Sequence, residues 1–122
     1  MLLRVLNGVM TLLLAYAAFV NLNDPDAPRW VAMYGAAAAV AGFAAFRPAM
    51  LPWAVPAVVA IIGAVWAATI APRVLGHVRW GELWDSYEMK VALVEEGREF
   101  SGLCIAAGWM AVVAIARVLA RR

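Results

Sequence analysis

TLLLAYAAFVNLNDPDAPRWVAMYGAAAAV, residues 11–40, consists of two apolar runs separated by a short polar stretch that contains two prolines. Each run is part of a segment near the length of about 20 residues that a membrane-spanning helix needs. Two similar segments follow, so we predict four spans, at about residues 2–21, 30–46, 51–71 and 100–119. The predicted fold is all-α, an integral membrane four-helix bundle that forms one domain over residues 1–122.

The composition supports a membrane protein. Of the 122 residues 66% are apolar, and the mean hydropathy is +0.83. A water-soluble domain of this size needs polar residues over most of its helical surface. Glycine and alanine are frequent in the last three spans, where small side chains let helices approach closely in lipid.

Charge is distributed unevenly between the two sides of the predicted bundle. One side has five arginines and no acid: Arg4, Arg47, Arg117, Arg121 and Arg122. The other has all eight acids with five basic residues. The positive-inside rule therefore predicts that both termini are cytoplasmic, with a bacterial inner membrane as the expected location. Anionic lipid attracts the basic side, so no nucleic-acid partner is expected.

The longest segment outside the spans, residues 72–99, contains an amphipathic pattern. Aromatic and apolar residues recur at the spacing of one helical face: Trp80, Leu83, Trp84 and Tyr87. We predict an interfacial helix that lies on the outer membrane surface between spans three and four and offers an interface to a partner. Gly97 is an expected break point near its end.

The polar stretch between the first two spans contains Asn23, Asp24 and Asp26. Either carboxylate is suited to cap the second helix, where negative charge is favourable. One cap needs only one side chain, however, and the stretch has several oxygen-bearing groups. Oxygen ligands of this kind also suit Ca²⁺ or Mg²⁺. Both interpretations stay open.

A second polar cluster, Glu95, Glu96, Arg98 and Glu99, leads into the fourth span. It fits a self-neutralising surface pair at the start of a helix. It also fits a pocket that both clusters form together, for a polar lipid headgroup or a divalent cation. If the ligand is a metal ion, the expected ligands are Asp24, Asp26, Glu95 and Glu99. A bridge from Asp24 or Asp26 to Arg98 would join the two helical hairpins.

Catalytic machinery is not evident. His77 is the only histidine, and Ser86 and Ser101 are the only serines. Neither serine lies in a nucleophile elbow, and one histidine excludes bis-histidine haem within a chain. We predict no catalytic residue and no cofactor. The single cysteine, Cys104, lies within the fourth span and excludes an intrachain disulfide.

Two motifs resemble those of the transmembrane protein 220 family. The first is Asn23-Asp24-Pro25-Asp26-Ala27, followed by Trp30 and Tyr34, and the second is Glu95-Glu96-Gly97-Arg98-Glu99, followed by Ser101-Gly102-Leu103. Asn7-Gly8 also resembles the family pattern. The resemblance implies an integral membrane protein with several spans, and it implies no particular reaction, ligand or transported substrate.

We therefore expect a small membrane protein that is not an enzyme. The first hypothesis is an accessory or assembly subunit of a larger membrane complex. The alternative is a binding module whose outer carboxylates hold a divalent cation or a polar lipid headgroup. The expected partners are the lipid bilayer and either other membrane subunits or further copies of the chain.

Overall fold

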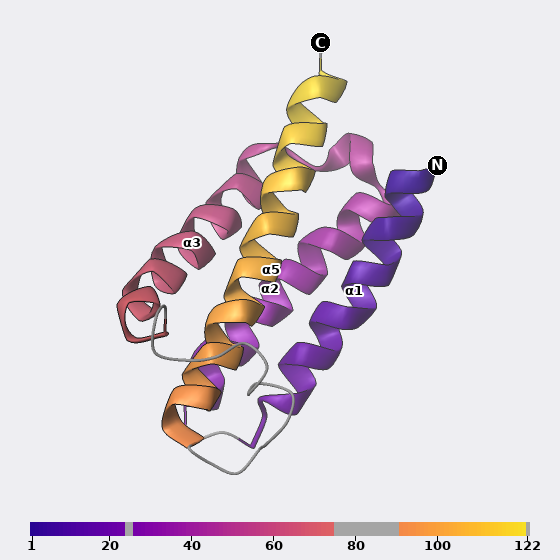
Figure 1. Ribbon diagram of the computed structural model, residues 1–122. Helices are drawn as coiled ribbons and strands as arrows, with labels where there is room; N and C mark the ends of the chain where they lie inside the picture. Colours follow the sequence, from indigo (N-terminus) through magenta and orange to yellow (C-terminus); the bar gives the residue numbers. More distant parts are fainter. Residues whose placement is uncertain (24–25, 75–90, 122) are drawn as a thin grey trace.

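Four long helices make up the computed structural model, which describes residues 1–23, 26–74 and 91–121 (Figure 1). They are α1 (Leu2–Val20), α2 (Ala27–Phe46), α3 (Ala54–Val74) and α5 (Val91–Ala120), and the 3-10 helix η1 (Pro48–Met50) joins α2 to α3. The side chains of residues 73–74 and 91–96 lie outside this description. Each long helix has a stretch long and apolar enough to cross a membrane: Leu2–Val20, Ala27–Phe46, Ala54–Pro72 and Gly97–Ala120. The predicted all-α bundle of four spans is confirmed.

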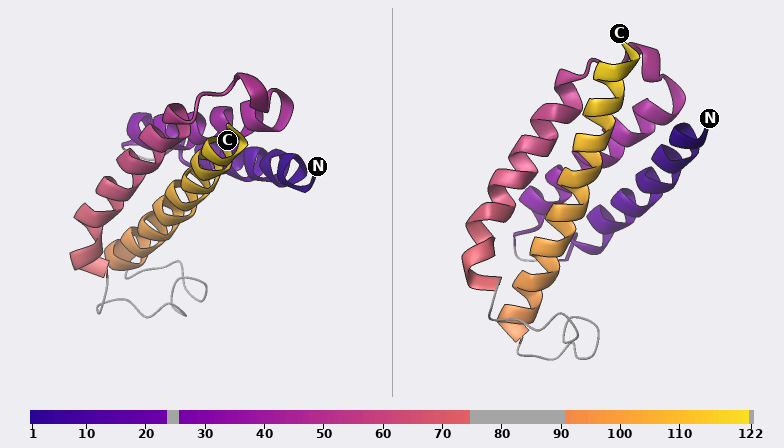
Figure 2. Two further views of the ribbon diagram at one scale, coloured as in Figure 1. Left: turned by 90° about the horizontal axis from the view of Figure 1, so that it is seen from above. Right: turned by 45° about the horizontal axis from the view of Figure 1, so that its top comes forward.

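The helices form two antiparallel hairpins, and α2 joins one hairpin to the other. Helix α1 packs along α2, and α3 packs along α5, while α2 also contacts both α3 and α5. Both chain termini lie at the same end of the bundle (Figures 1 and 2). We call this end the terminal end, and the opposite end, where α2 and α5 begin, the loop end.

The core lies around α2, because half of its span is buried, compared with 11% of the α1 span. Alanines on α2 pack with Leu103, Met110 and Val113 of α5. Helices α3 and α5 approach so closely that a Cβ atom added to Gly63 would lie 3.0 Å from the Cβ of Ala107. Small side chains therefore permit close packing where no hydrophobic effect drives helices together.

Two helices begin earlier than the sequence predicts. Helix α2 begins at Ala27 instead of residue 30, because Asp26 occupies its N-cap position and Pro28 fits its first turn. Helix α5 begins at Val91 instead of residue 100, and it continues through Gly97, so the expected break at this glycine is wrong. The aromatic stripe Trp80, Leu83, Trp84 and Tyr87 lies outside the described residues, and its interfacial helix stays a prediction.

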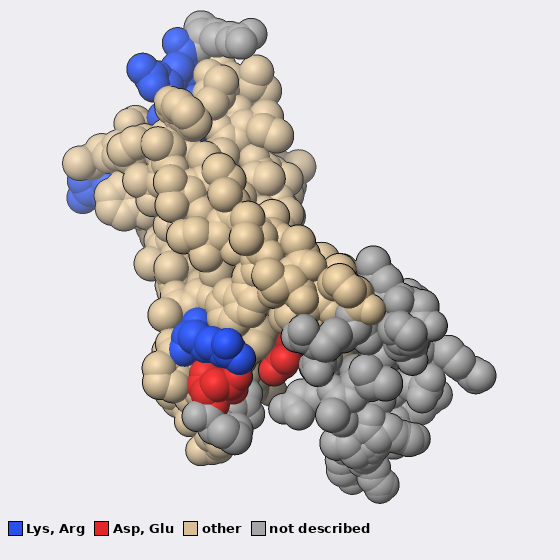
Figure 3. All heavy atoms as spheres, turned by 90° about the vertical axis from the view of Figure 1, so that its left-hand side faces the viewer, with Lys and Arg blue, Asp and Glu red and all other residues tan. Residues whose placement is uncertain are grey.

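Charged side chains lie at the two ends of the bundle. In Figure 3 one end shows only basic groups, and the other shows acidic groups next to a basic one. The described arginines of the terminal end are Arg4, Arg47, Arg117 and Arg121, while the described acids, Asp26 and Glu99, lie at the loop end. The described side chains thus give the terminal end a positive charge, whereas the loop end carries charges of both signs.

Candidate functional site

An ion pair stands at the start of α2. The guanidinium of Arg29 donates two hydrogen bonds to Oδ2 of Asp26, from Nη2 at 2.6 Å and from Nε at 3.2 Å. Asp26 occupies the N-cap position, but its side chain makes no capping hydrogen bond. The Arg29 hydrogen bond is the main reason why the pKa of Asp26 lies below its ordinary value. The carboxylate is therefore ionised at neutral pH.

Arg29 also lies over a pair of stacked indoles. Its guanidinium carbon is 5.8 Å from the ring centroid of Trp30 and 5.5 Å from that of Trp66. The two indoles are stacked with their centroids 4.4 Å apart. Both distances to Arg29 are within the range of a cation–π interaction. The stack connects α2 to α3, so the Asp26–Arg29 pair is held at a fixed position above the junction of these helices.

The indole N–H of Trp30 is an unusual feature of this junction. Trp30 is 1% exposed, and its Nε1 is buried without a hydrogen-bond partner among the described residues. The nearby carboxylate of Asp26 interacts with this N–H, and the interaction contributes to the lowered pKa of Asp26. The geometry of the contact nevertheless falls outside that of a good hydrogen bond. A buried donor of this kind favours negative charge at the position of Asp26.

Tyr34 brings the two sequence motifs together. Its ring is nearly buried and stacks next to Trp30. Its hydroxyl lies against Gly102 of α5, where any Cβ atom would collide with it. The carboxylate of Glu99 acts electrostatically on the same hydroxyl. The second motif thus meets the first through Tyr34, a residue that the sequence analysis had assigned no role.

The predicted polar cluster is only partly within the described side chains. Asp26, Arg98 and Glu99 lie at the loop end, and Asn23 is exposed there. Asp24 and the side chains of Glu95 and Glu96 lie outside the description. The described ion-pair partner of Asp26 is Arg29. The predicted bridge from Asp24 or Asp26 to Arg98 stays a prediction, because Asp24 lies outside the description. Asp26 and Arg29 are three residues apart, a helical pairing signal that the sequence analysis did not use.

The structure leaves the cation hypothesis as a prediction. Among the described residues there is no group of three or more histidine, cysteine or acidic side chains that could hold a metal ion. Two of the four predicted ligands, Asp24 and Glu95, are outside the described side chains, so the complete set is not represented.

A groove between α2 and α3 begins at the ion pair. Its volume is about 280 Å³, and Arg29 and Trp66 line it together with apolar residues: Ala32, Met33, Ala36, Val59 and Ile62. A second hollow of about 290 Å³ lies between the same helices nearer the terminal end, lined by Ala39, Val40, Phe43, Met50, Leu51, Pro52 and Val55. The loop-end groove therefore combines a charged rim with an apolar wall, as an amphiphile requires.

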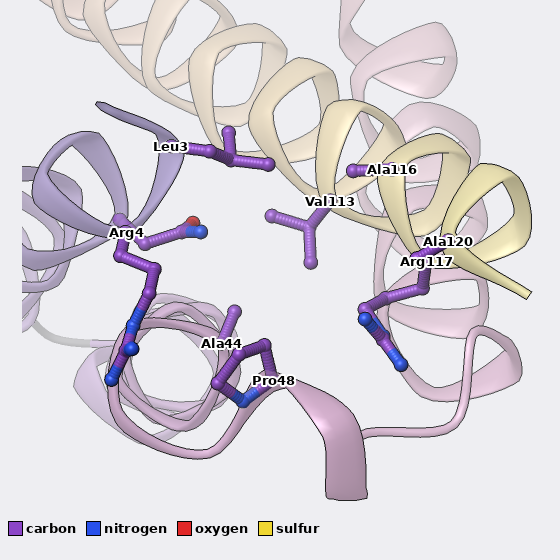
Figure 4. Close-up of a pocket in the computed structure, with 9 residues that line it drawn as sticks. Leu3, Arg4, Ala44, Pro48, Val113, Ala116, Arg117 and Ala120 are labelled. Atoms are coloured by element: carbon purple, nitrogen blue, oxygen red, sulfur yellow. The ribbon is translucent and has the colours of Figure 1, made fainter. Parts of the chain in front are cut away.

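At the terminal end a smaller cavity of about 120 Å³ opens between α1, α2 and α5, with Arg4 and Arg117 among its lining residues (Figure 4). Asn7 also lines it and is 2% exposed. Sequence reasoning used the two arginines only for orientation. The signal for Asn7 was available, because an amide inside an apolar span marks a functional position by default.

The family described as "Transmembrane family 220, helix" matches residues 13–115. The curated frog protein "Transmembrane protein 220" of Xenopus laevis is 30% identical over 126 aligned residues, which cover 88% of this chain and 55% of the frog protein. The chain thus spans about half the length of this relative. No solved structure matches.

Proposed function

This chain belongs to transmembrane family 220 and is an integral membrane protein, and we propose that it acts without catalysis as a lipid-binding module. Its loop end binds the polar headgroup of a zwitterionic phospholipid, and the groove between α2 and α3 receives an acyl chain. This proposal develops the binding hypothesis that the two polar motifs suggest.

The Asp26–Arg29 pair at the rim of the groove is the observation that carries the proposal. The side chain of Arg29 is 61% exposed and that of Asp26 is 40% exposed, so both are accessible to a ligand. Both hydrogen bonds from Arg29 end on Oδ2, which leaves Oδ1 of Asp26 to accept from an ammonium group. The remaining N–H groups of Arg29 can donate to a phosphate. Adjacent opposite charges match a headgroup that carries both.

The apolar part of the ligand is matched by the groove. Arg29, Ala32, Ala36 and Val40 share one face of α2, because they are three or four residues apart. The charged rim lies at the helix start, where an interfacial headgroup is expected, and the alanines lie deeper in the span. A phospholipid in this groove keeps its charges at the membrane surface and its chain in the hydrocarbon layer.

Thermal unfolding of the purified chain in detergent, with and without added phosphatidylethanolamine, tests this proposal. A ligand that binds only the folded protein raises the melting temperature. We expect that increase to be lost in Arg29→Gln and in Ala36→Phe, which blocks the groove. It should persist in two matched controls, Arg47→Gln at the terminal end and Leu12→Phe on the exposed face of α1. An equal increase in all four variants would refute the site.

Arg29→Gln, compared with a further variant, Asp26→Asn, separates the lipid from a divalent cation. Arg29→Gln removes the guanidinium next to the Asp26 carboxylate, and it should weaken binding of the zwitterionic headgroup. The same variant should strengthen binding of Ca²⁺ or Mg²⁺, because a competing positive charge is gone. Stabilisation by either ion that grows in Arg29→Gln and disappears in Asp26→Asn would favour the cation hypothesis instead.

An accessory or assembly subunit is the second function we propose. Helix α1 supports it, because it buries only Asn7 and Leu14 and so leaves most of its length available to a neighbouring helix. The aromatic stripe predicted from the sequence around Trp80 and Trp84 adds a contact surface to this proposal. Replacing Trp80, Trp84 and Tyr87 together by alanine should release a bound subunit or second copy. Unchanged migration on a native gel would count against this role.

We also propose that both termini are cytoplasmic, with the terminal end on that side. Four described arginines without a described acid at that end support this orientation. Reporter fusions to each terminus, one active only in the cytoplasm and one active only outside it, test the proposal. The placement in a bacterial inner membrane stays a prediction, because the relative compared above is a frog protein.

A further inference from the structure

We propose that the cavity at the terminal end binds the phosphate of an anionic phospholipid from the membrane leaflet on that side. This site is separate from the loop-end groove, and it goes beyond the function proposed above. It rests on the residues that line the cavity and on the charge of the terminal end.

Two arginines face the cavity from different helices. Arg4 belongs to α1 and Arg117 to the last turns of α5, and they lie on opposite sides of the opening (Figure 4). Leu3 and Val113 lie between them along one side, and Ala44 and Pro48 lie along the other. The space of about 120 Å³ holds several water-sized groups. The cavity thus has a cationic entrance and an apolar wall.

Both guanidinium groups are already held in place by the protein backbone. Arg4 donates from Nε to the carbonyl of Ala45 at 2.7 Å and from Nη2 to that of Phe46 at 3.3 Å. Arg117 donates from Nε to the carbonyl of Leu51 at 3.1 Å. Each guanidinium has five N–H donors, so most of them remain for a ligand. Because the side chains are preorganised, a ligand loses less entropy in ordering them.

Asn7 adds a neutral donor inside the cavity. Its Oδ1 accepts a hydrogen bond from Nε1 of Trp109 at 2.9 Å. Its amide NH₂ is therefore the group left to bind a ligand, and no hydrogen bond from it is found in the described part of the chain. Asn7 lines the cavity, so this amide can donate to a ligand that enters it.

The charge balance indicates that the ligand is an anion. The sequence has no acidic residue in 1–23, 27–81 or 100–122, and the described acids lie at the loop end. Arginines next to the hydrocarbon layer are costly unless an opposite charge pairs with them. An ammonium group would find no carboxylate here among the described residues, which disfavours a zwitterionic headgroup. An anionic phosphate supplies the missing charge, and acyl chains can follow Leu3 and Val113 into the membrane.

Native mass spectrometry of the full chain in detergent tests this proposal, with phosphatidylglycerol and phosphatidylethanolamine of identical chains as probes. We expect phosphatidylglycerol to bind more tightly. Arg4→Gln and Arg117→Gln should each weaken its binding about tenfold, as expected for loss of charge-assisted hydrogen bonds. Arg47→Gln removes the same charge at the same end outside the cavity lining, and it should leave the affinity unchanged.

A variant that keeps both arginines guards against a folding defect. Ala116→Leu places extra atoms in the cavity, and it should also reduce phosphatidylglycerol binding about tenfold. Equal losses in Arg47→Gln would show attraction by general charge and overturn the proposal. Retained binding in Ala116→Leu would exclude the cavity. Displacement of the lipid by inorganic phosphate at equal concentration would show a site for free phosphate instead of a lipid, and would overturn it as well.

Discussion

The hydrogen bond between Asn7 and Trp109 should contribute measurably to the stability of the bundle. It joins α1 to α5, and the donor–acceptor distance of 2.9 Å is ideal for an N–H···O bond. Hydrogen bonds between membrane helices contribute about 0.6 kcal/mol on average and about 1.7 kcal/mol at most. Because Asn7 is 2% exposed, we expect a coupling energy of about 1 kcal/mol, or about a fivefold change in the unfolding equilibrium.

A double-mutant cycle isolates this contribution. Asn7→Leu keeps the approximate shape of the side chain, and Trp109→Phe removes the N–H donor. Each single substitution should cost about 1–2 kcal/mol, because it leaves a partly buried partner without its bond. The double variant should cost about 1 kcal/mol less than the sum of the two. The Thr11 hydroxyl, which donates to the backbone carbonyl of Asn7, is unchanged in every variant.

Reversible unfolding in lipid bicelles, measured by steric trapping, gives the free energies of unfolding that the cycle needs. Additive single effects, with a coupling energy within about 0.3 kcal/mol of zero, would refute the reasoning. The two side chains would then contribute to stability only through packing with their own neighbours.

Three further predictions concern the loop end. Gly102→Ala should destabilise the bundle by about 1–3 kcal/mol in thermal unfolding, because its Cβ collides with the Tyr34 hydroxyl. Tyr34→Phe in the same chain should recover part of that loss. The carboxyl resonance of Asp26 should titrate below its ordinary pKa, and Arg29→Gln should raise the midpoint. Because this pKa is lowered in the folded protein, the ion pair stabilises at neutral pH and is lost as the pH falls through the folded-state value. Trp66→Leu removes the aromatic stack with Trp30. In the same unfolding assay it should lower the free energy of unfolding by about 1 kcal/mol more than the loss of buried apolar area explains.

The sequence was sufficient for the fold because apolar segment length nearly determines where a membrane chain can cross. Helix starts were harder to predict, since Pro28 and Asp26 allow α2 to begin before the apolar run. The expected break at Gly97 was wrong because α5 continues through this residue. Packing of the helix against its neighbours outweighs the low helix propensity of one glycine.

The polar sites were only partly predictable. The two motifs at the loop end do lie close together, and the described contact between them is that of Tyr34 with Gly102. The terminal cavity depends on Arg4 and Arg117, which are distant in the chain. They line one cavity only because the start of α1 and the last turns of α5 lie at the same end of the bundle. Periodicity along one helix gives no information about such a meeting.

The central position of α2 also has a consequence for biogenesis. During synthesis α1 and α2 enter the membrane before α3 and α5, and they can pair at once because they pack along each other. Asn7 cannot form its hydrogen bond with Trp109 until α5 has been made. Its amide thus crosses into the bilayer without its final partner, so the insertion of α1 depends on the strong hydrophobicity of its other residues. The packing of these four helices is completed only when α5 enters the membrane.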